Sequence, residues 1–454
     1  MKAVGKILVS AVAVMGAFAP GAGAQAVAGA ASPAVVPAPA YYGDARPDAP
    51  ELAARGPLRV GVRTQVIEHA DQLDILRVAD GTANPRYTRK LTLEIWYPAS
   101  LAPDQPEHTV YTDVLGSGPG NPARPNTPFQ FIGRAARDAQ PAPATAQSSP
   151  SAPSSRYPLV IVSHGYPGSR LQMSYLTENL ASKGFVVVAI DHAESTRADK
   201  AGFPSTLLNR PLDDLFVLQT VAGWAKAGSG HFLANLVDAS RTALVGYSMG
   251  GYGALNAAGA GISEAASAFV PGGSLAVHQQ GNPRYEARRD PRIKAVVAIA
   301  PWGGANKLWD AAGLAGLRTP TLFIAGDQDD IAGYEDGVLR LFQGAVHADR
   351  YLLTYRGARH NTAPNPPPPA AAAAGMEDFM AYAEPAWDST RINNINQHFV
   401  TAFLGITLKA QPLQAYLDVP PLPAGGTAGP DTAQWQGFPK RTAVGLELRH
   451  LPAQ

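Results

Sequence analysis

The sequence predicts an α/β fold with a mostly parallel central sheet, antiparallel strands on its N-terminal side and helices on both faces. Residues 59–68 and 89–98 alternate apolar and polar side chains, which is typical of half-buried antiparallel strands. From residue 157 onward, short continuous runs rich in Val and Ile indicate strands that are buried on both faces. Helical segments separate these runs, and this alternation indicates a doubly wound sheet.

The buried strands and the helices follow one another along the chain. We expect the strands at residues 157–163, 185–190, 242–245, 293–300, 321–325 and 350–355. We expect the helices at residues 171–183, 212–226, 248–259, 333–343 and 391–404. In such a sheet, functional residues gather in the loops that follow the carboxyl ends of the strands.

One domain is expected over residues 55–410. Residues 1–24 have the pattern of a secretory signal peptide, with Lys2 and Lys6, an apolar run and an Ala-Gly-Ala cleavage site. A membrane anchor is the alternative, but the apolar run is too short to span about 30 Å of hydrocarbon. We therefore expect an exported protein, periplasmic or extracellular, without stable membrane insertion. Residues 25–54 are expected to form a flexible Ala/Pro-rich leader, and residues 411–454 a Pro/Gly-rich extension.

Three insertions interrupt the pattern, near residues 116–155, 261–291 and 361–384. The first is rich in Pro, Ala, Ser and Gly, and we expect a surface excursion with one short helix at 129–137. The other two either cover a pocket or form loose surface loops.

Composition narrows the classes of ligand. The formal net charge is +1 and charged residues make up 16% of the chain, so no strong field recruits nucleic acid or an anionic membrane surface. A small, mostly uncharged molecule is the expected partner. The absence of cysteine excludes disulfides, thiolate metal sites and a cysteine nucleophile. His164 and His192 have no second ligand at metal spacing, so we expect no metal and no organic cofactor.

Residues 244–255 read LVGYSMGGYGAL and place Ser248 between Gly246 and Gly250. A G-x-S-x-G pattern arises by chance in glycine-rich chains, so its flanks decide its meaning. An apolar strand enters this turn and a helix of small residues leaves it, which is the context of a nucleophile elbow. Because the backbone of such a serine is strained, its neighbours two positions away must be small. Ser248 is therefore the predicted nucleophile.

The serine needs a base, and the base needs a carboxylate, in the chain order serine, acid, histidine. His360 is the predicted base because it follows the last buried strand, whereas His398 lies in the final helix, where a packing role is favoured. The segment GDQDDIAG offers Asp327, Asp329 and Asp330 as the acid. Since Asp and Gly also form ordinary turns, the residues themselves leave these three open.

Two backbone N–H groups are needed to stabilise the oxyanion of a tetrahedral intermediate. Met249, directly after the serine, is expected to supply one, and Tyr166 in HGYPG the other. An ordinary turn at the Pro-Gly pair is the alternative for the second. Trp302 and Tyr252, with Trp309, are expected near the mouth of the pocket, where they favour an apolar substrate group; aromatic packing is the alternative.

The segments SHGYPGS, LVGYSMGG, LFIAGDQDDIAG and YRGARHN together resemble the α/β-hydrolase superfamily. Residues 89–98 and 164–195 and the serine turn are similar to bacterial relatives of platelet-activating-factor acetylhydrolase, also described as predicted dienelactone hydrolases. Cutinase-like polyester hydrolases are a more distant resemblance.

The chain also departs from these families. Dienelactone hydrolases use cysteine, which is absent here. The acetylhydrolases take their acid after the strand at 293–300, where this chain reads APWGG. Cutinase-like enzymes take it one strand later, and their D-x-[IV]-A segment matches residues 329–332, so the resemblance implies Asp329. Their disulfide near the C-terminus is missing, so polymer activity is not implied.

These observations predict a serine hydrolase that cleaves carboxylic esters through an acyl-enzyme. In this prediction Ser248 attacks, His360 transfers the proton and Asp329 orients His360. A peptidase or an acyltransferase with the same triad is an alternative, as is a non-catalytic binding protein on a hydrolase scaffold. The sequence does not identify the ester or the oligomeric state.

Overall fold

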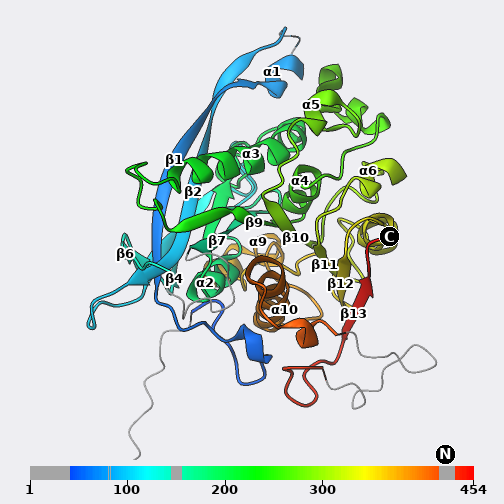
Figure 1. The fold of residues 1–454 in the computed structure, drawn as a ribbon. Coiled ribbons are helices and arrows are strands. Elements are labelled where there is room, and N and C mark those ends of the chain that lie inside the picture. Colours follow the sequence, from blue (N-terminus) through cyan, green and yellow to red (C-terminus); the bar gives the residue numbers. More distant parts are fainter. Residues whose placement is uncertain (1–40, 80, 82, 145–155, 419–434) are drawn as a thin grey trace, which may run out of the picture. The chain divides into compact units, whose positions relative to one another are not determined.

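A mixed sheet of 11 strands runs through the part of the chain that the computed structural model describes, residues 41–79, 81, 83–144, 156–418 and 435–454 (Figure 1). The strands are β1 (Val60–Leu73), β2 (Arg86–Ser100), β3 (Thr109–Leu115), β4 (Thr127–Gly133), β5 (Ala136–Arg137), β6 (Gln140–Pro141), β7 (Tyr157–Ser163), β8 (Val186–Asp191), β9 (Val237–Tyr247), β10 (Ile293–Ile299), β11 (Thr321–Gly326), β12 (Arg350–Tyr355) and β13 (Leu446–Leu451). The order in the sheet is β13-β12-β11-β10-β9-β7-β8-β2-β1-β5, with β6 paired to β2 and with β3 and β4 forming a separate hairpin.

The strands from β12 to β8 in this order run parallel, whereas β2 and β13 run antiparallel to their neighbours. The predicted α/β arrangement is therefore confirmed. The longer helices are α2 (Ser174–Ser182), α3 (Phe203–Trp224), α4 (Met249–Ala257) and α10 (Ser389–Lys409). Shorter helical segments are η1 (Glu51–Ala53), α1 (Ile75–Ala79), η2 (Ala265–Phe269), η3 (Pro271–His278), α5 (Pro283–Glu286), α6 (Ala311–Ala315), η4 (Tyr334–Leu339), α7 (Arg340–Gly344), α8 (Pro369–Ala374), α9 (Met376–Met380) and η5 (Gln414–Tyr416).

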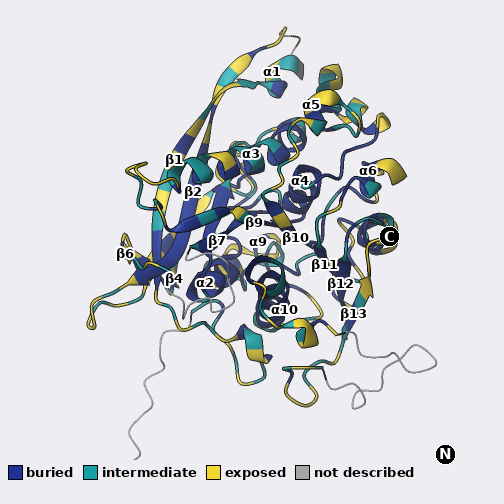
Figure 2. Cartoon of the chain, viewed as in Figure 1, coloured by how far each residue is buried: buried dark blue, intermediate teal, exposed yellow. Residues whose placement is uncertain are grey.

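Two hydrophobic layers cover the two faces of the central sheet. Alternate residues of β7 belong to different layers: Leu159 and Ile161 pack with α3 and α4, and Val160 and Val162 pack with α2 and α10. Figure 2 shows the parallel strands buried between the helices. This double burial explains the continuous apolar runs of the sequence. Among the described residues, no helix combines the length and the apolar composition that crossing a membrane requires.

The packed unit is wider than the expected domain at both ends. The side chains of Asn394 and Gln397 in α10 donate hydrogen bonds to the carbonyls of Asp44 and Gly43, so residues 41–54 lie against this helix. At the other end, β13 pairs with β12 and extends the sheet. The predicted signal peptide and most of the predicted leader lie outside the described residues.

The first insertion forms a strand where a helix was expected. Residues 127–133 are β4, which pairs with β3, so the prediction of a helix at 129–137 is wrong. Phe129 and Phe131 are two residues apart, which is the period of a strand. The third insertion packs on this hairpin, because Asp378 accepts hydrogen bonds from the amide of Gly116 and from Arg124.

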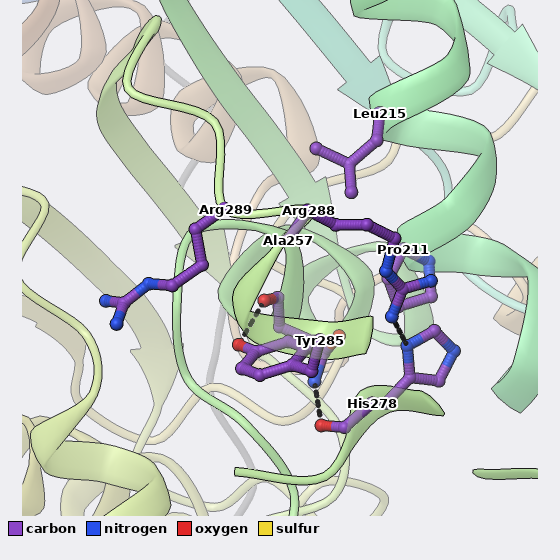
Figure 3. Close-up of a pocket in the computed structure, with 8 residues that line it drawn as sticks. Pro211, Leu215, Ala257, His278, Tyr285, Arg288 and Arg289 are labelled. Atoms are coloured by element: carbon purple, nitrogen blue, oxygen red, sulfur yellow. Dashed lines mark hydrogen bonds between the residues drawn. The ribbon is translucent and has the colours of Figure 1, made fainter. Parts of the chain in front are cut away.

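The insertion at 261–291 packs against the C-terminal end of α4, at the opposite end of this helix from Ser248. Tyr285 donates to the carbonyl of Asn256 at 2.7 Å, and Asn256 donates to the carbonyl of His278 at 3.2 Å (Figure 3). The cavity between these residues measures about 10 Å³, which holds no more than one water molecule. This insertion is therefore anchored on the helix layer of the domain.

Replacing Glu178 by Gln is expected to change how stability depends on pH. Glu178 in α2 accepts hydrogen bonds from Tyr111 of β3 at 2.7 Å and from the amide of Arg134 at 2.9 Å. Burial raises the pKa of Glu178 from 4.5 to about 7. Between these two pKa values, the folded chain keeps a proton on Glu178 that the unfolded chain releases. The contribution of the protonated Glu178 to the stability of the fold is therefore fully present below pH 4.5 and is lost as the pH rises through 7.

Urea unfolding of the wild type and Glu178→Gln at pH 5 and pH 8 measures this effect. Between pH 5 and pH 8, the free energy of unfolding of the wild type should decrease by up to about 3 kcal/mol more than that of the variant. Glu377→Gln, at an exposed position, is the control and should follow the wild type. Equal pH dependence of all three proteins would contradict the assignment.

Candidate active site

Ser248 occupies a strained turn between β9 and α4. Its φ is 52° and its ψ is −112°, in the left-handed region that side chains rarely adopt. A Cβ atom on Gly246 would lie 2.1 Å from the carbonyl oxygen of Gly250, and one on Gly250 would lie 2.0 Å from that of Ser163. Only glycine fits at either position, as the elbow interpretation requires.

His360 lies in the loop after β12 and reaches Ser248. Its Nε2 is 3.0 Å from Ser248 Oγ, and 12% of its side chain is exposed. The next residue, Asn361, donates hydrogen bonds to the carbonyls of Met380 and Ala383. The third insertion therefore anchors the loop that carries His360.

Asp329 follows β11 and lies against Nδ1, the other ring nitrogen of His360. His360 Nδ1 lies 2.9 Å from Oδ2 and 3.0 Å from Oδ1 of Asp329. Although burial raises the pKa of Asp329, the hydrogen bond from His360 and those from the amides of Ala332 and Ile331 hold it below its usual value. An ionised Asp329 accepts from Nδ1–H, which leaves Nε2 free to accept the proton of Ser248.

The other two acids of the segment point elsewhere. Asp327 accepts from the amide of Gly357 at 2.6 Å and lies 3.4 Å from Arg356. Asp330 forms an exposed ion pair with Arg359. Of the three acids that the residues left open, the structure places Asp329 against His360.

The amides of Tyr166 and Met249, the two predicted oxyanion donors, belong to segments that adjoin paired strands. Tyr166 belongs to the loop after β7, which is paired with β9 through Ser163 and Gly246. Met249 is the first residue of α4, where backbone N–H groups have no partner in the helix. Within the described part of the chain, neither amide donates a backbone hydrogen bond to another group.

Three partly exposed aromatic rings adjoin the serine turn. The amide of Trp302 donates to the carbonyl of Ser248 at 3.0 Å, so the backbone of Trp302 lies beside that of the nucleophile. The ring centroid of Phe203 lies 5.3 Å from that of Tyr166 and 5.2 Å from that of Trp302, and both pairs are edge to face. Phe203 is not among the residues predicted from the sequence, because a single aromatic residue at a helix start carries no recognisable signal.

Tyr252 and Trp309 do not reach the surface, which corrects the expectation that they lie at the pocket mouth. The hydroxyl of Tyr252 donates to the carbonyl of Leu207 at 2.9 Å. Pro211 has no N–H for this carbonyl inside α3, so Tyr252 satisfies it. Trp309 is also buried and donates to the carbonyl of Ala260. Both residues therefore pack in the core, which agrees with the alternative prediction of aromatic packing.

His398 is a core residue of α10. It is fully buried, and its Nδ1 accepts a hydrogen bond from the amide of Leu52 at 3.2 Å. Burial lowers the pKa of His398 to about 3. Its ring packs against Phe399, Tyr416 and Phe438.

A second serine, histidine and aspartate meet behind this site. Ser163 Oγ lies 2.8 Å from His192 Nε2, and His192 Nδ1 lies 2.9 Å from Asp213 Oδ2. All three are buried, with Ser163 only 2% exposed. Burial, reinforced by the charge of Arg210, lowers the pKa of His192 to about 3. A buried serine beside so weak a base is a poor nucleophile, whereas Ser248 lies at the strained turn.

Part of the chain is similar in sequence to known proteins. Residues 147–280 match the family described as PETase, PET hydrolase-like. Cutinase est1 of Thermobifida alba is 30% identical over 176 residues, which cover 39% of this chain and 44% of that protein. A bis(hydroxyethyl) terephthalate hydrolase of Streptomyces coelicolor is 25% identical over 202 residues, which cover 44% of this chain and 49% of that protein. The chain thus spans less than half the length of these curated relatives.

A solved structure shows the fold over a longer stretch. A ferulic acid esterase from Streptomyces cinnamoneus superposes with a TM-score of 0.52 at 20% identity, covering 80% of this chain and 94% of that chain. This likeness shows an α/β-hydrolase-like fold. The comparisons support the resemblance to PETase-like and cutinase-like enzymes, and the resemblance to the acetylhydrolases stays a prediction.

Covalent labelling distinguishes the two serines. Ser248→Ala is expected to abolish labelling by a fluorophosphonate and to lower ester turnover on the order of 10⁴-fold or more, because the attacking oxygen is removed. Ser163→Ala should still be labelled, at Ser248. Intact mass and peptide mapping after labelling measure both outcomes, with near-UV circular dichroism to confirm folding. A label on Ser163 would contradict the assignment of Ser248 as the nucleophile.

Proposed function

We propose that this chain, with its α/β-hydrolase-like fold and its similarity to cutinases, is a serine hydrolase that cleaves carboxylic esters. The observation that supports this most directly is the hydrogen-bonded chain from Ser248 through His360 to Asp329 on a strained turn. The two available amides of Tyr166 and Met249 complete the set of groups that acyl transfer requires.

In the proposed reaction, His360 takes the proton of Ser248 Oγ as this oxygen attacks the carbonyl carbon of the ester. The carbonyl oxygen becomes an oxyanion, which the amides of Tyr166 and Met249 stabilise. His360 then gives the proton to the leaving alcohol, and an acyl-serine remains. Water attacks this acyl group while His360 accepts its proton, and the carboxylic acid leaves. Asp329 stabilises the imidazolium in both halves of the reaction.

We infer that the ester carries an apolar, aromatic group. The partly exposed rings of Tyr166, Phe203 and Trp302 lie beside the nucleophile and offer aromatic edges and faces to such a group. One similar protein is named a bis(hydroxyethyl) terephthalate hydrolase, and terephthalate is an aromatic diacid.

Export is part of the proposal. The lysines, apolar run and Ala-Gly-Ala site of residues 1–24 support it. The N-terminal sequence of the mature protein tests it, because cleavage at this site leaves Gln25 first.

Asp329→Asn should lower kcat by about 10³- to 10⁴-fold, because His360 loses the group that holds its tautomer. Asp327→Asn and Asp330→Asn are the controls and should retain kcat within about threefold. Steady-state kinetics on a chromogenic ester measures these values. An equal loss of kcat in one of the controls would contradict the assignment.

A panel of esters tests the substrate class. Wild-type enzyme should prefer aromatic acyl groups over straight-chain ones of equal size, and Phe203→Ala should reduce this preference by roughly fivefold, because an aromatic contact contributes about 1 kcal/mol. Phe216→Ala, which removes another partly buried phenylalanine of α3, stacked on His69, is the matched control. The ratio of kcat/KM values measures the preference, and an unchanged ratio in Phe203→Ala would exclude Phe203 from the pocket.

A further inference from the structure

A buried guanidinium lies against the loop that carries the Tyr166 amide. Arg210 extends from α3 and is 1% exposed. Its Nη1 donates to the carbonyl of His164 in a short hydrogen bond, and its Nη2 donates to the carbonyl of Gly165 at 2.9 Å. The planar guanidinium therefore holds two consecutive carbonyls of this loop.

The carbonyl of Gly165 and the amide of Tyr166 belong to the same peptide group. In the described chain, the peptide after Tyr166 is cis, and the peptide between Gly165 and Tyr166 is trans. In a trans peptide the C=O and N–H bonds point in opposite directions. Because Arg210 holds the carbonyl, the N–H of Tyr166 must point away from the guanidinium. A hydrogen bond to the carbonyl also polarises the peptide and strengthens its N–H as a donor.

His164 supports the same carbonyl. Its Nε2 accepts from the amide of His192 at 3.2 Å, so its proton lies on Nδ1, which is 2.6 Å from the carbonyl oxygen of Gly165. Burial and the charge of Arg210 keep the pKa of His164 well below its usual value, which favours this neutral form. Two donors thus hold one carbonyl.

The second serine, histidine and aspartate extend this network. With Asp213 ionised, His192 donates through Nδ1 and accepts at Nε2 from the hydroxyl of Ser163, whose oxygen accepts from Arg210 Nη1 at 3.2 Å. Nη2 also donates to Ser195 at 2.7 Å. Both Nη groups of Arg210 thus have acceptors, while its Nε–H has no hydrogen-bond partner among the described residues. The four hydrogen bonds from the Nη groups hold the guanidinium in place.

Two acidic residues, Asp214 and Asp213, lie near Arg210, and their negative charge raises its pKa against the effect of burial. Asp213 is balanced by Arg89, which donates two hydrogen bonds to it at 2.8 and 2.9 Å. Asp214 makes no hydrogen bond within the described residues, and burial raises its pKa well above the usual value, which favours the neutral acid. Burial lowers the pKa of Arg210 to about 9, so it remains a cation at neutral pH.

We propose that Arg210 is a positioning residue for the oxyanion hole: it orients the Tyr166 amide through the carbonyls of His164 and Gly165 and supplies positive potential behind that amide. This inference rests on the proposed ester hydrolysis. Arg210 does not touch the substrate and acts through the peptide group that it holds.

The test compares Arg210→Met and Arg210→Lys with the wild type. Active-site titration with a fluorophosphonate counts competent molecules, so that kcat is expressed per working site. The inhibition constant of a phenylboronic acid, which forms a tetrahedral adduct on the serine, reports the oxyanion hole directly. Arg350→Met is the matched control, because Arg350 is also 1% exposed and donates to backbone carbonyls, at the opposite end of β12 from the His360 loop.

We expect Arg210→Met to lower kcat per site by about 10²-fold with KM within about threefold, and Arg210→Lys to lower it by about 10-fold. The affinity for the boronic acid should fall by the same factor as kcat/KM. Arg350→Met should lower the unfolding temperature and leave kcat per site unchanged. Unchanged kcat per site and inhibitor affinity in both Arg210 variants, or an equal loss in Arg350→Met, would overturn the proposal.

Ser195→Ala removes one acceptor of Arg210 without removing a charge, and it decides the matter if neither Arg210 variant folds. A loss of about threefold or more in kcat per site and in boronic acid affinity supports the proposal, and no loss in either overturns it. A wild-type chain that hydrolyses no ester overturns the proposed function and this inference together. A wild-type chain that is active while the variants keep kcat per site overturns this inference alone.

Discussion

The contact between the turn at Ser248 and the loop after β7 is the constraint on which the site depends. The backbone of Gly250 lies so close to the carbonyl of Ser163 that a Cβ atom would be 2.0 Å from its oxygen. This approach brings the start of α4 beside the end of β7, so that the predicted oxyanion donors, Met249 and Tyr166, belong to neighbouring segments. The parallel pairing of β7 with β9 sets the level at which they meet. The strain at Ser248 is maintained because the surrounding sheet and helix allow no other path.

The two serine, histidine and aspartate arrangements show that geometry alone does not make a nucleophile. Ser248 and Ser163 both lie within 3.0 Å of an imidazole nitrogen, and both imidazoles face an aspartate. They differ in surroundings. Burial and the charge of Arg210 lower the pKa of His192 to about 3, whereas Ser248 lies on the strained turn between β9 and α4. We therefore propose that the Ser163 set holds a loop in place and that the Ser248 set reacts with a substrate.

The parallel sheet, the serine turn and the chain order of acid and histidine could be predicted because each has a local signal. Buried strands are continuously apolar, and the elbow requires Gly246 and Gly250 at fixed spacing. Other features had no local signal. Three acids in one short segment are equivalent until the fold places one of them against His360. Tyr252 resembles a pocket residue in the sequence, but its ring packs in the core and its hydroxyl donates to the carbonyl of Leu207, which Pro211 leaves without a backbone donor. Phe203 lies beside the serine turn solely because α3 begins there.

Local sequence patterns were sufficient to predict the fold class and the strained turn at Ser248, and they limited the acid to three aspartates, because these depend on periodicity, on steric fit within a few residues and on the order of strands. Only the folded chain shows that Asp329 meets His360, which aromatic rings remain exposed and that Arg210 reaches the loop after β7. These depend on distances between segments that lie far apart in the chain. Such distances follow from the packing of all the elements together, and no short stretch of sequence contains them.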